Sequence, residues 1–337
     1  GYAWGSPAKT INTDVVVVGA GGAGLTAAIT AKEAGADVVV VEKMMIIGGN
    51  TLRATGGLNA AGTVYQDKAG IKDSPDVHYE DTMKGGRYEN VPELVRTMVD
   101  NAAAAVEWLN DLGANLIQVN LSGGSTNARS HAPEGGGAVG PAVVMTLQNA
   151  AKERGIEVLT QTKAAEVLVE GGQVAGIRCE TKDGELIVKA KAVVIATGGY
   201  GANPDMVVKY RPDLKGFATT NHYGATGDGL VLAYRVGAKL SFIDTMQYHP
   251  TGAAFPEQIL GLLGSRGLPI RERLEFAIVR TPADLEAETG TPGGAIYGTA
   301  AHGAIRSLRP ANRSPIRGVF LAGGTVHPGG GLPLAAL

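Results

Sequence analysis

Three glycines and one acid near the amino end have the types and spacing that hold a dinucleotide. Gly19, Gly21 and Gly24 form the pattern G-x-G-x-x-G, and Glu42 follows the last of them by ~18 residues. The first glycine permits a tight turn, the second lets the backbone approach a pyrophosphate, and the third lets a helix pack closely on a strand. Glu42 can accept hydrogen bonds from both ribose hydroxyls, whereas a 2′-phosphate would be repelled there. The spacing therefore predicts a dinucleotide cofactor that lacks this phosphate.

These residues need a strand, a helix and a second strand to position them. Residues 14–18 are a β-branched run typical of a buried parallel strand, and residues 38–41 are a second such run that ends at Glu42. A helix between the two strands would point its amino end at the phosphates. A glycine turn that binds nothing is the alternative, but the strand, helix and acid at this spacing favour the nucleotide.

Further glycine-rich loops could close around the same ligand. The buried strand 192–196 runs directly into Thr197, Gly198 and Gly199, and Asp228 stands between two glycines at the start of a helix over 229–237. Parallel sheets present ligand-binding loops at such strand ends. Residues 47–63 form another loop, in which the polar residues Asn50, Thr51, Arg53 and Thr55 alternate with small ones. A helix that begins near Pro141 after a glycine-rich loop predicts a second helix start suited to an anion.

The remaining pattern predicts packing elements. Apolar residues with helical spacing predict helices over 73–84 and 92–112. Strand-like alternation, separated by glycine turns, is typical of a small meander attached to the main sheet, with strands at 157–160, 165–170, 173–181 and 185–189. We therefore predict an α/β, Rossmann-like domain with a parallel sheet and an inserted β-meander near residues 157–190.

Composition excludes several classes of partner. The net charge is −2, with 30 basic and 32 acidic residues, and aromatic residues make up 5% of the chain. Such a balance gives no electrostatic footprint for nucleic acid or an anionic membrane, and few aromatic rings argue against a single-strand stacking platform. The single cysteine, Cys179, excludes an internal disulfide and a cysteine-ligated metal site. We expect neither a metal centre nor an attached haem.

The sequence predicts no transmembrane segment. The most apolar window, residues 15–31, is interrupted by four glycines, and the nucleotide-binding pattern explains it. Residues 1–12 lack the basic start and apolar core of a signal peptide. A cytoplasmic protein and a processed exported protein would look alike, so we expect a soluble protein whose localisation is not readable from the sequence.

The order of these motifs resembles the flavoprotein subunit family of fumarate reductase and succinate dehydrogenase, which includes soluble flavocytochrome-type fumarate reductases and ketosteroid dehydrogenases. The likeness covers roughly residues 12–263. It rests on VVVVGAGGAGLTAAITAKEAGADVVVVEK, GGNTLRATGGLNAAGT, EDTMKGG, GGAVGPAVV, VVIATGGYG, TTNHYGATGDGL and MQYHPTGAAFPEQILGLL. The cofactor implied by this resemblance is FAD.

The resemblance also implies roles for individual residues. Gly19, Gly21, Ala23 and Gly24 would face the pyrophosphate, and Glu42 would face the ribose. Lys43 and the backbone of Ala164 would lie on the adenine side, and Asp228 would close the pocket near the flavin edge. The flavin or ribityl side would be lined by Asn50, Thr51, Gly56 and Gly57. Thr197 and Gly198, at the strand end described above, complete the predicted cofactor set of this part of the chain.

The same resemblance gives a chemical meaning to the motif His249-Pro250-Thr251. In that family the histidine would help to hold a carboxylate or carbonyl of an unsaturated substrate above the flavin, so His249 and Thr251 are the catalytic candidates. A capped turn with a packed imidazole is the alternative interpretation. For Arg129 and His131, in a loop that would run near the cofactor, we favour phosphate or structural hydrogen bonding.

After Leu263 the sequence departs from this family. The expected capping domain, which would supply an arginine proton donor, is absent or much shortened. Instead, residues 273–337 resemble the end of the phytoene desaturase family through RTPADLE, GGAIYG, RPANRSPI and GVFLAGGTVHPGGGLP, which suggests a chimera or composite. That resemblance adds Gly323, Gly324, Gly331, Leu332 and Pro333 to the predicted FAD site.

The expected domains follow from the two resemblances. They are an N-terminal extension (1–12), an FAD-binding domain (13–249), a junction or shortened cap (250–300), and a C-terminal return to the FAD-binding domain (301–337).

Three functions remain open. The first is a fumarate reductase-like enzyme that transfers hydride between flavin and an activated C–C bond of a small unsaturated acid or enone, with a dicarboxylate as candidate substrate and an unknown electron partner. The second is a desaturase or amine oxidase-like enzyme that acts on an apolar substrate. The third is an FAD-binding module without turnover.

Overall fold

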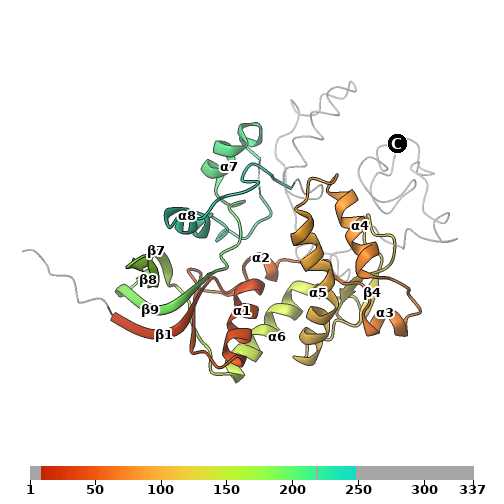
Figure 1. The fold of residues 1–337 in the computed structure, drawn as a ribbon, viewed down its shortest axis with the longest axis horizontal. Coiled ribbons are helices and arrows are strands. Elements are labelled where there is room, and N and C mark those ends of the chain that lie inside the picture. The colour runs from red at the N-terminus through yellow and green to blue at the C-terminus, as the bar shows by residue number, and fades with distance from the viewer. Residues whose placement is uncertain (1–8, 218, 248–337) are drawn as a thin grey trace, which may run out of the picture. The chain divides into compact units, whose positions relative to one another are not determined.

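A six-stranded sheet organises the part of the chain that the computed structural model describes, residues 9–217 and 219–247 (Figure 1). Its strand order is β6-β2-β1-β9-β8-β7. The first four strands are parallel neighbours, and β9, β8 and β7 are antiparallel. The bounds are β1 Lys9–Val18, β2 Val38–Val41, β6 Glu157–Leu159, β7 Lys163–Glu170, β8 Gln173–Thr181 and β9 Gly184–Ile195. The predicted α/β class with a parallel sheet is confirmed.

The valine runs form the middle of this sheet because both of its faces are covered. All four residues of β2 are buried. Val17 and Val40 belong to an apolar cluster with helix α1 (Gly22–Glu33) and helix α6 (Val139–Glu153), whereas Val16 and Val41 belong to a second cluster with β7, β8 and β9. A strand covered on both faces reads as a continuous apolar run, which is the pattern of β1 and β2.

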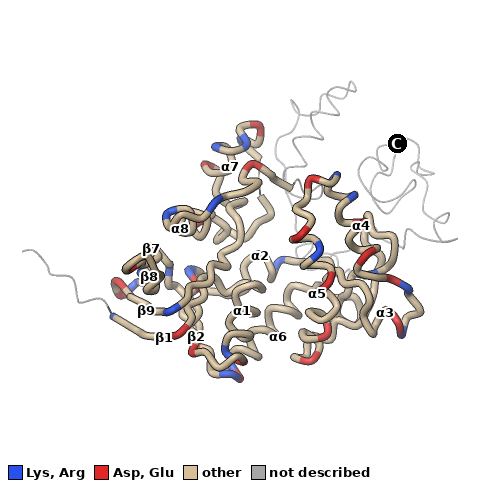
Figure 2. Tube along the Cα trace, in the orientation of Figure 1, with Lys and Arg blue, Asp and Glu red and all other residues tan. Residues whose placement is uncertain are grey.

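A smaller antiparallel sheet and several helices complete the described residues. Its order is β3-β5-β4, with β3 Leu58–Asn59, β4 Gln118–Asn120 and β5 Ser130–Ala132. The other helices are α2 Gly49–Leu52, α3 Val64–Lys68, α4 Pro75–Gly85, α5 Pro92–Asp111, α7 Pro204–Tyr210, the 3-10 turn η1 Pro212–Leu214 and α8 Asp228–Arg235. Figure 2 shows basic and acidic residues interspersed over the outer helices α4 and α5, as the near-neutral net charge leads one to expect.

The meander predicted for residues 157–190 differs from the structure in two respects. β6 pairs in parallel with β2 and so belongs to the main sheet, not to the meander. The strands predicted at 185–189 and 192–196 are one continuous strand, β9. No turn residue separates them, and Leu186, Val188 and Ala190 continue the same buried face. The meander therefore consists of β7, β8 and the first part of β9, and it grows directly out of the main sheet.

The first strand is longer than the prediction. It begins at Lys9, five residues before the apolar run, because Lys9–Asn12 pair with residues 186–189 of β9. Lys9, Thr10 and Asn12 are exposed and Ile11 is only partly buried, so these residues do not extend the apolar run, and pairing with β9 holds them in the strand. Part of the predicted N-terminal extension is therefore strand.

The helix start predicted near Pro141 is occupied by protein. Helix α6 begins at Val139, and the N–H of Gly140 donates to the carbonyl of Ala54 at 2.9 Å. A Cβ on Gly140 would lie 2.3 Å from the oxygen of Thr51. The glycine thus lets α6 pack against α2, and the expectation of a second open anion site was wrong.

Within residues 9–217 and 219–247, no helix combines the length and apolarity needed to cross a membrane. The predicted junction (250–300) and C-terminal return (301–337) lie outside the described residues.

Candidate functional site: a pocket at the carboxyl ends of β1, β2 and β9

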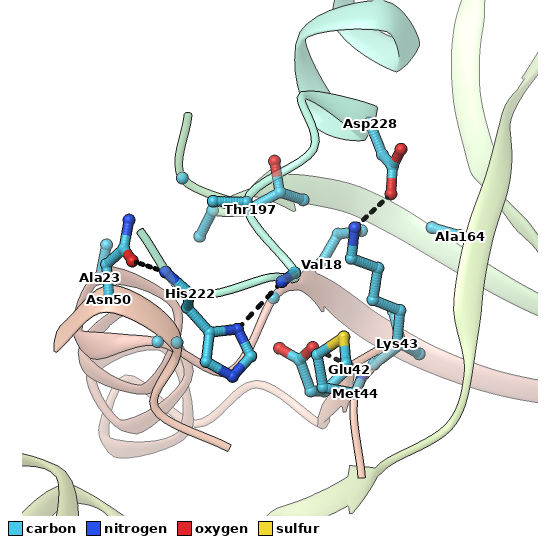
Figure 3. A pocket seen from close by; sticks show the side chains of 18 of the residues that line it. Val18, Ala23, Glu42, Lys43, Met44, Asn50, Ala164, Thr197, His222 and Asp228 are labelled. Carbon is cyan, nitrogen blue, oxygen red and sulfur yellow. Dashed lines mark hydrogen bonds and ion pairs between the residues drawn. The ribbon is translucent and has the colours of Figure 1, made fainter. Parts of the chain in front are cut away.

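A pocket of about 220 Å³ opens where β1, β2 and β9 end (Figure 3). Val18, Val41 and Ala196 mark those three strand ends in its wall. Crevices outside the carboxyl ends of parallel strands are the usual ligand sites of open α/β sheets. The start of helix α1, helix α2 and the loop before α8 form the rest of the wall.

The three glycines of the first loop serve different purposes. Gly19 has a φ of +105°, and a Cβ there would lie 2.5 Å from the oxygen of Ala196. A Cβ on Gly24 would lie 1.8 Å from the oxygen of Gly19, so α1 can approach the turn only without a side chain. Gly21 is different, because its backbone is extended (φ −84°, ψ −173°) and the protein atom nearest to a Cβ would be 3.7 Å away. Neither backbone nor packing requires glycine there, so its open side is left to the pocket.

The amino end of α1 offers positive potential to this pocket. No side chain caps the helix, and its first turn contains no acidic residue. The N–H of Gly22 donates to Oγ1 of Thr51 at 3.0 Å, which ties α2 to the helix start. Peptide N–H groups and the helix dipole at such an end favour an anion such as phosphate.

Glu42 places a fixed carboxylate at the end of β2. Its Oε2 accepts from the N–H of Ala20 at 2.9 Å, and its Oε1 accepts from the N–H of Met44 at 2.8 Å. Each carboxylate oxygen can accept further hydrogen bonds. The arrangement holds negative charge where a ribose diol can donate to it and where a phosphate would be repelled.

Lys43 and Asp228, which both line the pocket, form an ion pair with Nζ 2.7 Å from Oδ2. Burial by itself raises the pKa of Asp228, but the hydrogen bond and charge of Lys43 outweigh it and hold the pKa below its ordinary value. The pair joins the end of β2 to the start of α8. Figure 3 shows its dashed line beside Ala164, which contributes to the same wall.

His222 is a pocket residue that was not among those predicted from the sequence. It lies in the pocket wall, the N–H of Gly224 donates to its Nδ1 at 3.1 Å, and its own N–H donates to Oδ1 of Asn50 at 2.6 Å. The histidine stands inside a motif that carries the family resemblance, TTNHYGATGDGL, which was the available signal. No spacing in the sequence links it to Asn50, since 172 positions separate them.

The structure brings most of the predicted cofactor residues together. Those in the pocket wall are Gly19, Gly21, Ala23, Glu42, Lys43, Asn50, Thr51, Ala164, Thr197, Gly198 and Asp228. Gly24 lies behind the turn. Gly56 and Gly57 do not line the pocket, and a Cβ on Gly57 would lie 2.4 Å from Oγ of Ser130 in β5. The predicted residues His249, Thr251, Gly323, Gly324, Gly331, Leu332 and Pro333 lie outside the described part of the chain.

Arg129 and His131 contribute to the protein interior. Arg129 is fully buried, and its guanidinium lies 2.9 Å from Asp73 through Nε and 2.8 Å from Asp81 through Nη2. His131 is also fully buried, between Oγ1 of Thr63 at 2.8 Å and the oxygen of Arg129 at 2.9 Å. Neither residue lines the pocket.

We expect His131 to make stability depend on pH. Burial lowers the pKa of His131, although its two backbone acceptors oppose the shift. Below about pH 6.5 the imidazole of the unfolded chain takes up a proton that the folded protein resists, so the free energy of unfolding falls as the pH falls. Urea titrations between pH 7.5 and 5.5 should show this slope, and His131→Gln should flatten it. Equal slopes in the two proteins would contradict the assignment.

The comparisons with known proteins agree with this geometry. Residues 14–269 match the family model described as FAD binding domain. The chain belongs to the FAD binding domain family. Its cofactor is accordingly FAD, and the resemblance to the FAD-binding body of fumarate reductase and succinate dehydrogenase flavoproteins is confirmed.

Two curated relatives and one solved structure of another protein illustrate what this chain is similar to. NADH:fumarate oxidoreductase of Klebsiella pneumoniae is 48% identical over 248 residues, which are 73% of this chain and 27% of that protein. Urocanate reductase of Eggerthella lenta is 39% identical over 249 residues, 72% of this chain and 41% of that protein. A flavocytochrome c3 fumarate reductase in an open conformation aligns with a TM-score of 0.69 and 42% identity, over 72% of this chain and 43% of that one. The chain thus spans less than half the length of each.

The pocket residues suit FAD. The uncapped start of α1 suits its pyrophosphate, the absent Cβ of Gly21 leaves room for the approach, and Glu42 suits a ribose without 2′-phosphate.

Proposed function

We propose that this chain takes part in the reduction of an activated C=C bond in a small unsaturated acid, or in the reverse oxidation. The observation that carries the proposal is the 48% identity to an NADH:fumarate oxidoreductase over 248 residues, 73% of this chain. The likeness to a urocanate reductase widens the substrate class to unsaturated acids beyond fumarate.

In this proposal the described residues bind and orient FAD. The N–H groups at the start of α1 donate to the pyrophosphate, which the open side of Gly21 lets approach, and Glu42 accepts hydrogen bonds from the ribose hydroxyls. Asn50 and Thr51 face the ribityl chain and the flavin. Lys43 and Ala164 bound the adenine side, and Asp228, paired with Lys43, closes the pocket near the flavin edge. Contacts of Gly56 and Gly57 with the flavin stay predictions.

FAD when bound supplies hydride transfer at N5, and the protein must bind the substrate and deliver a proton. We assign substrate binding to His249 and Thr251, as the family resemblance implies. An imidazole and a hydroxyl can both donate hydrogen bonds to a carboxylate or carbonyl oxygen, which would withdraw charge from the conjugated double bond. The electron donor is not assigned.

The proposal predicts that fumarate reoxidises the reduced protein. Dithionite added under anaerobic conditions should bleach the bound flavin, and fumarate should restore the oxidised spectrum with one succinate formed per flavin. The saturated analogue succinate should leave the flavin reduced, because it has no double bond to accept hydride and proton. A flavin that stays reduced with fumarate, urocanate and acrylate alike would contradict the proposal and leave a binding module without turnover.

The alternative of a desaturase or amine oxidase-like enzyme depends on residues 273–337, whose motifs resemble the phytoene desaturase family. We keep as a hypothesis that this segment is of composite origin and completes the FAD site through Gly323, Gly324, Gly331, Leu332 and Pro333. Turnover with an apolar polyene or an amine, and none with unsaturated acids, would favour it.

A further inference from the structure

His222 presents one defined nitrogen to the pocket. The N–H of Gly224 donates to Nδ1 at 3.1 Å, so Nδ1 carries no proton in this arrangement. A neutral imidazole then has its proton on Nε2. Within residues 9–217 and 219–247, Nε2 hydrogen bonds to no protein group. The side chain thus offers an unused N–H donor in the wall of the FAD site.

Asn50 holds the backbone of His222, while Gly224 and Tyr223 hold its imidazole. Asn50 accepts from the N–H of His222 at 2.6 Å through Oδ1 and donates to Oδ1 of Asn221 at 2.7 Å through Nδ2. The ring also stacks on Tyr223, with centroids 4.3 Å apart and planes 28° apart. Figure 3 shows the ring inside the pocket, with one dashed line at Nδ1 and another at the backbone nitrogen of His222. A donor that is already oriented loses little entropy when a ligand accepts from it.

The contacts of Asn50 place this donor near the start of α1. Asn50 lies in α2, and the next residue, Thr51, accepts from the N–H of Gly22 at the first turn of α1. Gly48, just before α2, bridges to Gly21. His222 is therefore attached through α2 to the same helix end that suits a pyrophosphate.

The hydrogen-bonding chemistry of the neighbouring groups indicates which part of FAD accepts from His222, the pyrophosphate or the ribose. The ribose diol needs acceptors, which Glu42 supplies, whereas phosphate oxygens only accept. Burial lowers the pKa of His222, and Arg53 lowers it further while Glu42 opposes the shift. The ring is thus a neutral donor at pH 7. Glu42, Asn50 and His222 line the same pocket, so the donor lies in the wall that the ribose acceptor and α2 also form.

We propose that Nε2–H of His222 donates a hydrogen bond to a pyrophosphate oxygen of FAD, from the loop 219–226 and in addition to the N–H groups of α1. This bond would hold the loop before α8 against the cofactor. Asn50 positions His222 by accepting from its backbone N–H.

Two substitutions separate the acceptor function of Nδ1 from the donor function of Nε2. His222→Asn keeps an acceptor for the Gly224 N–H at the place of Nδ1 but removes the donor at Nε2. His222→Gln reaches as far as Nε2 and can donate there through its amide. A hydrogen bond to a charged oxygen is worth roughly 1.5–3 kcal/mol, so we expect the FAD dissociation constant to rise by about tenfold or more in His222→Asn. In His222→Gln it should stay within about threefold of the wild type.

The experiment compares FAD titrations of the three flavin-free proteins by flavin fluorescence, with their thermal midpoints before FAD is added. The 31P spectrum of bound FAD is the direct readout, since loss of the bond should shift a pyrophosphate resonance in His222→Asn and restore it in His222→Gln. The matched control Tyr234→Leu, at an exposed ring of α8 that does not line the pocket, should change neither the affinity nor the spectrum.

Three results would overturn the proposal. The first is wild-type affinity in His222→Asn. The second is an equal loss of affinity in both variants together with a lower thermal midpoint, because His222 would then only support the loop. The third is a 31P spectrum that does not change between wild type and His222→Asn, because the imidazole would then bind elsewhere on the cofactor.

Discussion

Gly21→Ala should lower the affinity for FAD by on the order of 100-fold, about 2.7 kcal/mol, without harm to the fold. A methyl group at this position would occupy the space through which the pyrophosphate approaches the backbone. Inside the protein it meets no obstacle, since the nearest atom would be the Gly48 oxygen at 3.7 Å and the backbone angles suit alanine. The unfolded chain also loses freedom, so the flavin-free variant should be more stable than the wild type by about 0.4–1 kcal/mol.

The measurement pairs an FAD titration with urea unfolding of the flavin-free protein. Gly24→Ala is the matched control, because its Cβ would lie 1.8 Å from the backbone oxygen of Gly19, and overpacking of this kind costs about 1–3 kcal/mol or more. Gly24→Ala should therefore be less stable than the wild type, and its loss of FAD affinity should follow from that instability. If Gly21→Ala destabilised the flavin-free protein as much as Gly24→Ala does, the assignment of Gly21 to the ligand would be wrong.

Asp73→Ala should destabilise the protein by about 3–5 kcal/mol, because it leaves a buried guanidinium without its main partner. The side chains of Arg129 and Asp73 are 1% and 0% exposed. Asp73 also accepts from the side chains of Gln66 and Asn127, both at 3.1 Å, so its loss removes these two hydrogen bonds as well. The guanidinium would keep only Asp81.

Asp76→Ala provides a control three positions along the chain. Asp76 also pairs with an arginine, Arg96 at 2.8 Å, but its side chain is 85% exposed. Exposed ion pairs contribute about 0–1 kcal/mol, so the midpoint of urea unfolding should scarcely move. Similar losses in both variants would show that burial of the Arg129 pair does not set its contribution.

The sequence was sufficient for the cofactor loop because its signals are local. The turn at Gly19, the helix from Gly22 and the acid at Glu42 all lie within about 30 residues, where spacing alone limits the geometry. The predictions for α4 and α5 succeeded for the same reason, since one helix face needs only its own periodicity.

The features that the sequence did not reveal depend on distant partners. Lys9–Asn12 are strand only because β9 lies beside them, and β6 belongs to the main sheet only because it pairs with β2. The function of Gly140 becomes visible when α2 packs on it. His222 has the same character, since Asn50 fixes it from 172 positions away. No pattern within a short window can report such contacts.

The proposed function depends on FAD binding in the pocket at the ends of β1, β2 and β9. The most direct test is the absorbance spectrum of the purified protein after incubation with FAD and removal of the excess, with flavin and protein quantified separately. We expect one bound flavin per chain in the wild type and a large deficit in Gly21→Ala without any loss of thermal stability. A wild-type protein that retains no flavin, or a Gly21→Ala protein that retains as much as the wild type, would contradict it.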